Sequence, residues 1–113
     1  MMLTQTPWGH QILWAHTENY VGKILHINKG HRLSRQYHIK KDETIYVLEG
    51  TLRLEVGGSD QEILHLTKGQ SYHITPRTIH RFCALEDSPV TLAEVSTTEL
   101  LDVVRLEDDY NRI

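Results

Sequence analysis

The sequence has little of several features that mark particular classes of protein. Cys83 is the only cysteine, so no disulfide can form within the chain, and a cytoplasmic, reducing location is expected. No apolar run approaches the ~18 residues of a membrane span, and residues 1–7 lack the charged and apolar regions of a secretory signal. The net charge of −3 lacks the basic excess of nucleic-acid-binding surfaces. We therefore expect neither a membrane nor a nucleic-acid partner.

The pattern that is present belongs to short β-strands. Leu52, Leu54 and Val56 alternate with polar residues, and the Gly-Gly-Ser-Asp run at 57–60 is typical of a hairpin turn. Further strands are expected at Val21–Ile27, Gln36–Ile39, Thr44–Leu48, Glu62–Leu66, Ser71–Ile74, His80–Ala84 and Thr91–Val95. So many short strands at this spacing predict an all-β sandwich or barrel with very little helix.

The 113 residues suit a single domain without a linker or a repeat. Residues 1–20 are predicted to form an N-terminal arm, and residues 103–113 a C-terminal tail packed on the barrel. Between the last strand and the tail, Thr97–Asp102 could form one helical turn, capped by Thr97 or Thr98.

One segment combines residues that could hold a metal ion. Gln36 and His38, two residues apart on a predicted strand, point to the same face. A turn of four residues then brings Glu43 back beside them, and His80 reaches the same interior if the strands close into a barrel. Two imidazoles, a carboxylate and an amide oxygen suit zinc first, with iron, manganese, nickel and cobalt as alternatives, better than magnesium.

Each histidine taken alone also has a simpler explanation. Histidine is often partly buried and hydrogen-bonded without binding a metal. The joint spacing of Gln36, His38, Glu43 and His80 favours a divalent metal site over that explanation.

Three stretches carry a resemblance to a known family. They are Pro7-Trp8-Gly9, then Leu33-Ser34-Arg35-Gln36-Tyr37-His38 followed by Glu43 and Gly50, and the closing run Val104–Arg112. With them the sequence resembles the cupin superfamily, and more narrowly the cupin domain of type II mannose-6-phosphate isomerases, from Pro7 to Arg112. The GDP-mannose pyrophosphorylase domain often fused to that cupin has no counterpart here, so a stand-alone cupin is expected.

The resemblance implies a fold, a cofactor and an activity. The fold would be a double-stranded β-helix, or jelly-roll, barrel, with Tyr110 and Arg112 holding the tail against it. The family's metal ligands map onto Gln36, His38, Glu43 and His80. A metal-dependent isomerase that interconverts an aldose phosphate and a ketose phosphate is the first expectation, with a small-molecule sugar phosphate as substrate and a homodimer as assembly.

The sequence also departs from the family pattern. Lys41 replaces an arginine that the family uses in isomerisation, which keeps the charge but loses the planar bidentate fork. Thr75-Pro76-Arg77 replaces the usual Pro-x-Gly before His80. Two other functions therefore stay open, namely a non-catalytic cupin that binds a sugar or sugar nucleotide, and a metal-dependent dioxygenase.

Cationic residues beside the ligand segments are candidates for substrate binding. We predict that Arg35, Lys41, Arg77 and Arg81 bind a phosphate group, although solvated surface charge is the alternative for each. For proton transfer, the candidates are Lys41, which would need a strongly lowered pKa, and a barrel-facing His73.

Residues between the ligand segments are expected to build the barrel. Tyr46, Val47, Leu48 and Phe82 are predicted to lie in its wall or core. Cys83, next to Phe82 on a strand, is predicted to be a buried and unreactive thiol.

Overall fold

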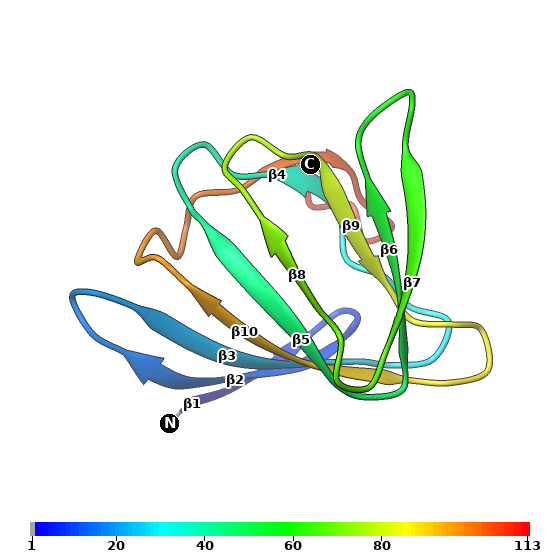
Figure 1. Ribbon diagram of the computed structural model, residues 1–113, viewed down its shortest axis with the longest axis horizontal. Helices are drawn as coiled ribbons and strands as arrows, with labels where there is room; N and C mark the ends of the chain where they lie inside the picture. Colours follow the sequence, from blue (N-terminus) through cyan, green and yellow to red (C-terminus); the bar gives the residue numbers. More distant parts are fainter. Residues whose placement is uncertain (1) are drawn as a thin grey trace.

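A computed structural model describes residues 2–113 as two facing antiparallel sheets (Figure 1). The strands are β1 (Met2–Thr6), β2 (Gly9–His16), β3 (Val21–Ile27), β4 (Arg35–Tyr37), β5 (Glu43–Glu49), β6 (Thr51–Val56), β7 (Glu62–Thr67), β8 (Ser71–Ile74), β9 (His80–Cys83), β10 (Val90–Ser96) and β11 (Val104–Glu107). One sheet has the order β1-β2-β3-β10-β5-β8, and the other β11-β4-β9-β6-β7. The prediction of an all-β barrel with very little helix is confirmed.

The strands from β3 to β10 match the predicted ranges to within two residues at either end. The predicted N-terminal arm is instead largely a hairpin, in which β1 pairs with β2 and β2 pairs with β3. The alternation of apolar and polar residues did not reveal β2, because Gln11 faces inward but is polar. It lies opposite Leu25 of β3 and lines the cavity.

The helical turn predicted at Thr97–Asp102 is wrong. The segment is an irregular turn between β10 and β11, and Thr97 does not cap a helix. Its hydroxyl oxygen instead accepts a hydrogen bond from the Asp42 backbone N–H, at 3.0 Å. A tertiary contact thus uses the side chain that the local pattern assigned to a cap.

The apolar core fills one end of the space between the sheets. Ile45 and Val47 are fully buried on β5, whereas Tyr46 between them is 45% exposed, because successive strand residues point to opposite faces. Tyr46 thus lies in the barrel wall and Phe82 in the core, which confirms the prediction that each lies in the wall or core. Cys83 is buried as predicted, and burial raises the pKa of its thiol to about 11.

Gly50 makes the tight connection from β5 to β6. Its φ of 83° lies in the left-handed region that side chains with a Cβ avoid. A Cβ at this position would also lie 2.3 Å from the Pro89 carbonyl oxygen. Gly50, part of the motif that carries the family resemblance, thus lies where the backbone turns sharply.

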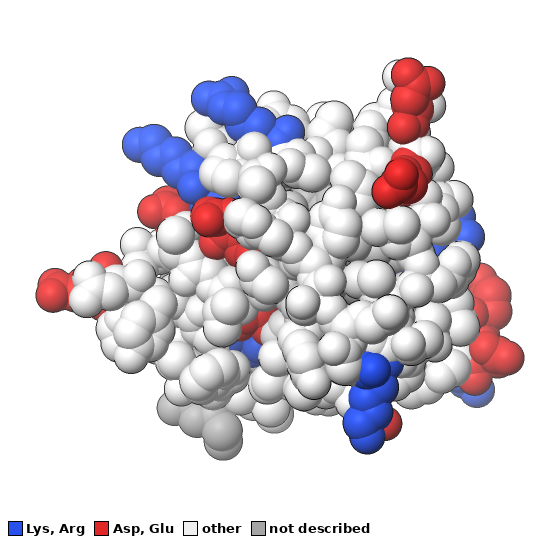
Figure 2. All heavy atoms as spheres, viewed as in Figure 1, with Lys and Arg blue, Asp and Glu red and all other residues white. Residues whose placement is uncertain are grey.

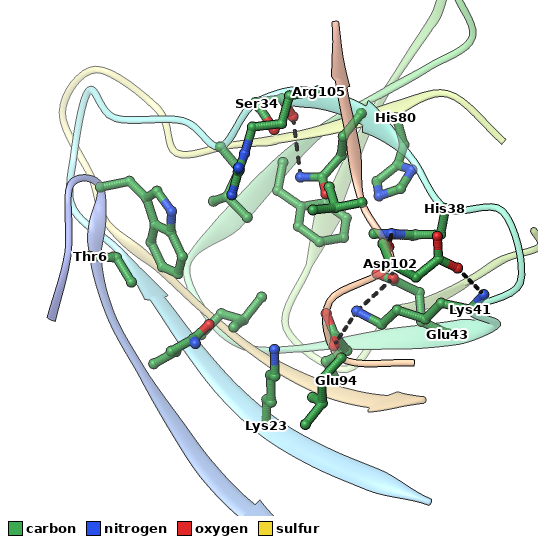
Figure 3. Close-up of a pocket in the computed structure, with 18 of the residues that line it drawn as sticks. Thr6, Lys23, Ser34, His38, Lys41, Glu43, His80, Glu94, Asp102 and Arg105 are labelled. Atoms are coloured by element: carbon green, nitrogen blue, oxygen red, sulfur yellow. Dashed lines mark hydrogen bonds and ion pairs between the residues drawn. The ribbon is translucent and has the colours of Figure 1, made fainter. Parts of the chain in front are cut away.

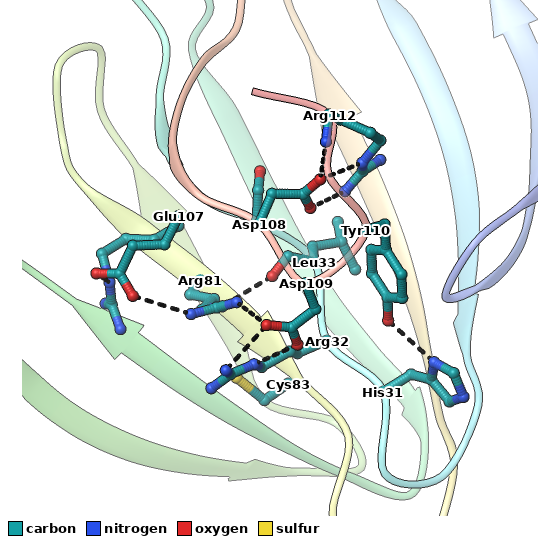
Figure 4. A network of polar contacts seen from close by, with 12 residues as sticks. His31, Arg32, Leu33, Arg81, Cys83, Glu107, Asp108, Asp109, Tyr110 and Arg112 are labelled. Atoms are coloured by element: carbon teal, nitrogen blue, oxygen red, sulfur yellow. Dashed lines mark hydrogen bonds and ion pairs between the residues drawn. The ribbon is translucent and has the colours of Figure 1, made fainter.

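The C-terminal tail is tied to the five-stranded sheet by ion pairs (Figure 4). Asp109 lies 2.7 Å from Arg32 Nε and 3.2 Å from a terminal nitrogen of Arg81. Arg81 also donates to the Leu33 carbonyl at 2.8 Å, and its side chain is only 1% exposed. Arg81 therefore holds the tail in place and is enclosed by protein.

Two further contacts complete this attachment. Tyr110 packs against the core, and its hydroxyl lies 2.9 Å from His31 Nδ1. Arg112 pairs with the fully enclosed Asp108 carboxylate at 2.7 Å, and its guanidinium lies 5.4 Å from the Tyr110 ring. These contacts fold the last residues back over the barrel.

The outer face of the six-stranded sheet is largely apolar and uncharged. Leu3, Trp14 and Val95, on strands of this sheet, are each more than half exposed, and the side of the molecule seen in Figure 2 carries its charged residues mainly at the edges. The expected homodimer stays a prediction. No helix within residues 2–113 is long and apolar enough to cross a membrane.

Candidate metal centre

Three buried side chains meet at one end of the barrel (Figure 3). His38 follows β4, Glu43 begins β5 and His80 begins β9. One imidazole nitrogen of each histidine and one carboxylate oxygen of Glu43 all lie within 4.8 Å of one another. Both sheets contribute, so the group exists only in the folded chain.

Strand pairing and one turn place these ligand atoms. Gln36 on β4 pairs directly with His80 on β9, so the two side chains share the face toward the cavity. Between His38 and Glu43 the chain turns, and the Asp102 carboxylate accepts hydrogen bonds of 2.7–3.0 Å from successive backbone N–H groups at 39–41. These bonds lower the pKa of Asp102 to about 2.

Hydrogen bonds to main-chain carbonyls orient both imidazoles. His38 Nδ1 lies 2.6 Å from the Asp102 carbonyl oxygen, and His80 Nδ1 lies 2.9 Å from that of Thr78. Carbonyl oxygens only accept, so Nδ1 carries the proton in each neutral ring and Nε2 presents a lone pair. Metal-binding histidines are commonly held in this way.

Nitrogen and oxygen atoms of the three ligand residues face one another inside the barrel. His80 Nε2 is buried without a hydrogen-bond partner within residues 2–113, and Glu43 Oε2 has the Lys41 ammonium at 3.2 Å. Glu43 Oε2 lies 2.9 Å from His38 Nε2, so in the neutral ring two acceptors face each other. Two buried acceptors that face each other at this distance are unfavourable unless a cation lies between them. The donor set therefore fits a divalent metal ion.

The protonation states agree with ligand roles. Burial alone would raise the pKa of Glu43, but a hydrogen bond from His38, in the form protonated at Nε2, and the charge of Lys41 outweigh burial and lower the pKa to about 2. Burial lowers the pKa of His80. Glu43 is thus a carboxylate and His80 a neutral imidazole, the forms that bind metals.

Gln36 lies beside this group on the same wall of the cavity. Its amide nitrogen donates to the Ser34 carbonyl at 3.4 Å, which leaves its amide oxygen as the free acceptor. The structure therefore brings all four residues of the predicted metal set to one cavity.

The cavity between the sheets has a volume of about 280 Å³. Its titratable lining consists of Lys23, His38, Lys41, Glu43, His80, Glu94, Asp102, Arg105 and Arg112. Trp8, Leu25, Leu33 and Phe82 form an apolar part of the wall. A small polar ligand with an anionic group suits such a lining.

Lys41 is buried between two carboxylates. Its Nζ lies 3.2 Å from Glu43 Oε2 and 3.2 Å from Glu94 Oε2. Burial would lower the pKa of Lys41, but Glu94 and Glu43 outweigh it and raise the pKa. The lowered pKa that the role of a base would need is therefore absent, and Lys41 is a cation.

Glu94 was not predicted as a site residue. It is 4% exposed on β10 and lines the cavity, and burial and nearby Glu43 raise the pKa of Glu94. A signal did exist, because Glu94 interrupts the apolar set of Val90 and Leu92 on the inward face of its strand. Lys23 interrupts the inward face of β3 in the same way.

Several predicted site residues lie outside the cavity. His73 points outward from β8, its ring 57% exposed and 2.6 Å from Asp42, because the next residue, Ile74, faces the core. Arg77 is exposed in the turn between β8 and β9. Arg35 and Arg81 pair with Glu107 of the tail. None of these four residues lines the cavity.

The two facing sheets, with a buried His–Glu group inside, define a double-stranded β-helix of the cupin class. KdgF from Halomonas sp. has this fold, with a TM-score of 0.73, 21% identity and 86% of each chain covered. Within that class, the chain belongs to the mannose-6-phosphate isomerase C-terminal family, whose model matches residues 2–112.

Curated relatives of this family are much longer proteins. Xanthan biosynthesis protein XanB from Xanthomonas campestris pv. campestris is 32% identical over 109 residues, which cover 94% of this chain and 23% of XanB. Mannose-1-phosphate guanylyltransferase ManC from Salmonella typhimurium is 32% identical over 110 residues, which cover 95% of this chain and 22% of ManC. The chain thus spans about a fifth of the length of these relatives.

Proposed function

We propose that the protein is a metal-dependent isomerase that interconverts an aldose phosphate and a ketose phosphate, with mannose 6-phosphate as the first substrate to test. The observation that carries the proposal is the buried group of His38, Glu43 and His80, whose acceptor atoms converge at a cavity that cations also line. The description of the family that the chain belongs to supports the choice of substrate.

Gln36, His38, Glu43 and His80 would hold the ion, and zinc is the first candidate for this mixed nitrogen and oxygen set. A bound divalent ion supplies Lewis-acid polarisation of the sugar oxygens at the reacting carbons. The enclosed position of the ligands, none more than half exposed, keeps bulk water away from that end of the cavity.

Aldose–ketose exchange needs a base that moves a proton between neighbouring carbons. We assign this role to Glu94 in place of His73 and Lys41, because its carboxylate lines the cavity and burial raises its pKa. Glu94 would take the proton from C2 of the aldose and return it to C1, while the O2 hydroxyl proton moves to O1. Lys41 holds the Glu94 carboxylate in position at 3.2 Å.

A second function is favoured by one specific observation. Lys41 stands where the family has its arginine, and both of its carboxylate partners lie within the protein. A lysine held in this way has less freedom to contact a substrate than an unpaired arginine. This arrangement suits a non-catalytic cupin that binds a sugar phosphate or sugar nucleotide.

The two functions are separated by one assay. Protein loaded in turn with zinc, cobalt, nickel, manganese or iron is mixed with mannose 6-phosphate, and fructose 6-phosphate is followed by NMR. Isomerisation predicts turnover that Glu94→Gln lowers by about 100-fold or more, while His73→Gln outside the cavity leaves it unchanged. No turnover with any ion, together with a rise in melting temperature on adding the sugar phosphate, supports the binding function instead.

A further inference from the structure

The cavity wall carries a row of three side chains that runs away from the metal ligands. Arg105 on β11 pairs with Gln36 on β4, and Gln36 pairs with His80 on β9. Directly paired residues of antiparallel strands project from the same face of the sheet. Arg105 therefore points into the cavity on the wall that carries two of the metal ligands, as Figure 3 shows.

Arg105 differs from Lys41 and Arg112, two other cations of the cavity, in having no acidic partner within residues 2–113. Lys41 pairs with Glu43 and Glu94, and Arg112 pairs with Asp108. No ion pair or side-chain hydrogen bond of Arg105 occurs within residues 2–113, although the side chain is half-buried. A guanidinium in this position has its fork of donors unused.

Two neighbouring groups make this end of the cavity suitable for an anion. The Ser34 hydroxyl, on the same wall, is buried without a hydrogen-bond partner, and the residue is 1% exposed. Lys23 faces the cavity from the opposite sheet and has no ion pair within residues 2–113. An oxyanion beside Arg105 would thus meet a second positive charge across the cavity and a free hydroxyl nearby.

We propose that Arg105 is the anchor for the phosphate group of the substrate and so selects a terminally phosphorylated sugar. The identity of the sugar rests on the proposed function, whereas the anion site does not. Arginine suits this task because its planar fork can donate two parallel hydrogen bonds to a phosphate. Arg105 takes the role that sequence analysis gave to Arg35, Arg77 and Arg81.

The spacing along the row explains the selection. Two inter-strand steps separate the backbone at His80 from the backbone at Arg105, which amounts to roughly 10 Å. That span is comparable to an extended six-carbon sugar with its phosphate at one end. A sugar held by Arg105 through a phosphate on C6 would therefore present C1 and C2 to the metal ligands. A sugar held through a phosphate on C1 would lie in the opposite orientation, with C6 toward the metal ligands.

Isothermal titration calorimetry on the metal-loaded protein tests the anchor. The ligands are mannose 6-phosphate, mannose and inorganic phosphate, and the variants are Arg105→Gln, Arg105→Lys and the control Arg77→Gln. Arg77→Gln removes the same charge from an exposed turn outside the cavity. Arg105→Gln is expected to lower the affinity for mannose 6-phosphate and for inorganic phosphate by about tenfold or more and to leave the affinity for mannose unchanged.

The remaining outcomes also decide the matter. Arg105→Lys keeps the charge but not the planar fork of donors, so its affinity for mannose 6-phosphate and inorganic phosphate is expected to fall by a smaller factor. If Arg105→Gln does not fold, Arg105→Lys replaces it in the test. The proposal is overturned if wild-type protein binds mannose as well as mannose 6-phosphate, if the Arg105 variants bind phosphate like wild type, or if Arg77→Gln weakens binding equally.

The outcome is distinguishable from failure of the proposed function. If phosphate binding depends on Arg105 but no fructose 6-phosphate forms, the anchor stands and the isomerase activity does not. If turnover occurs and Arg105→Gln changes neither the binding of mannose 6-phosphate nor KM, the isomerase stands and the anchor does not.

Discussion

Lys41 Nζ lies 3.2 Å from Glu94 Oε2, and both residues are buried in the wall of the cavity. This contact joins the turn after β4 to the inward face of β10, far apart in the sequence. It holds the lysine that replaces the family's arginine as a charged residue between two carboxylates. The same contact holds the carboxylate of Glu94, the proposed base, in the cavity wall.

Removing one metal ligand should remove the metal. His38→Ala and His80→Ala are each expected to lower the metal content of purified protein from about one ion per chain to a small fraction, because each deletes a nitrogen donor. Elemental analysis by mass spectrometry measures this content and identifies the ion. The control His73→Ala changes a histidine outside the cavity and should keep the metal. Full occupancy in either of the first two variants would contradict the assigned site.

Loss of the Lys41 charge should destabilise the protein. Lys41→Met leaves the carboxylates of Glu43 and Glu94 buried without their cation, which is expected to cost roughly 3 kcal/mol. Urea unfolding of metal-free protein measures the change, with exposed Lys40→Met as the control expected to stay close to wild type.

The deficit of the Lys41→Met variant should depend on pH. Burial already raises the pKa of Glu94, and removal of Lys41 would raise it further. A carboxyl whose pKa is raised by folding makes the folded state less stable as pH rises through that range. The deficit is therefore expected to be larger at pH 8 than at pH 5. An equal loss of stability at pH 5 and pH 8 would show that the ionisation of Glu94 is not the cause of the loss.

Asp102 should stabilise the turn before β5 only while it is ionised. Folding lowers the pKa of Asp102 from 3.8 to about 2 through its backbone hydrogen bonds. Its contribution is thus complete above the unfolded value and is lost as pH falls toward the folded value. Asp102→Ala should be less stable than wild type at pH 6, with the difference shrinking between about pH 4 and pH 2. Urea unfolding across this range checks it, and the difference between Asp102→Asn and Asp102→Ala should not change with pH, because neither variant ionises at this position.

Gly50 should not tolerate a side chain. Gly50→Ala is expected to destabilise the protein by more than about 1 kcal/mol, because the residue is left-handed and a Cβ would meet the Pro89 carbonyl. Gly58→Ala, where the nearest atom to a Cβ would be Ile79 Cδ1 at 3.5 Å, should stay close to wild type. Equal melting temperatures of the two variants would count against the strain at Gly50.

Much of the fold could be predicted because its signals are local. Alternation along β6 and the glycine at position 50 both act over a few neighbouring residues. The hairpin of β1 and β2 escaped prediction, since its inward residues include the polar Gln11. Thr97 escaped for a related reason, because its hydroxyl bonds to Asp42 from another part of the chain.

The sequence by itself determined the strands, the tight turns and the candidate ligand set, because the period of a strand and the spacing of Gln36, His38 and Glu43 are properties of short segments. Only the tertiary structure decided which charged residues face the cavity. Arg35 and Arg81 pair with Glu107 of the tail, whereas Arg105 and Lys23 point inward. The physical reason is that the partner of a charged side chain depends on strand register and on where distant carboxylates come to lie.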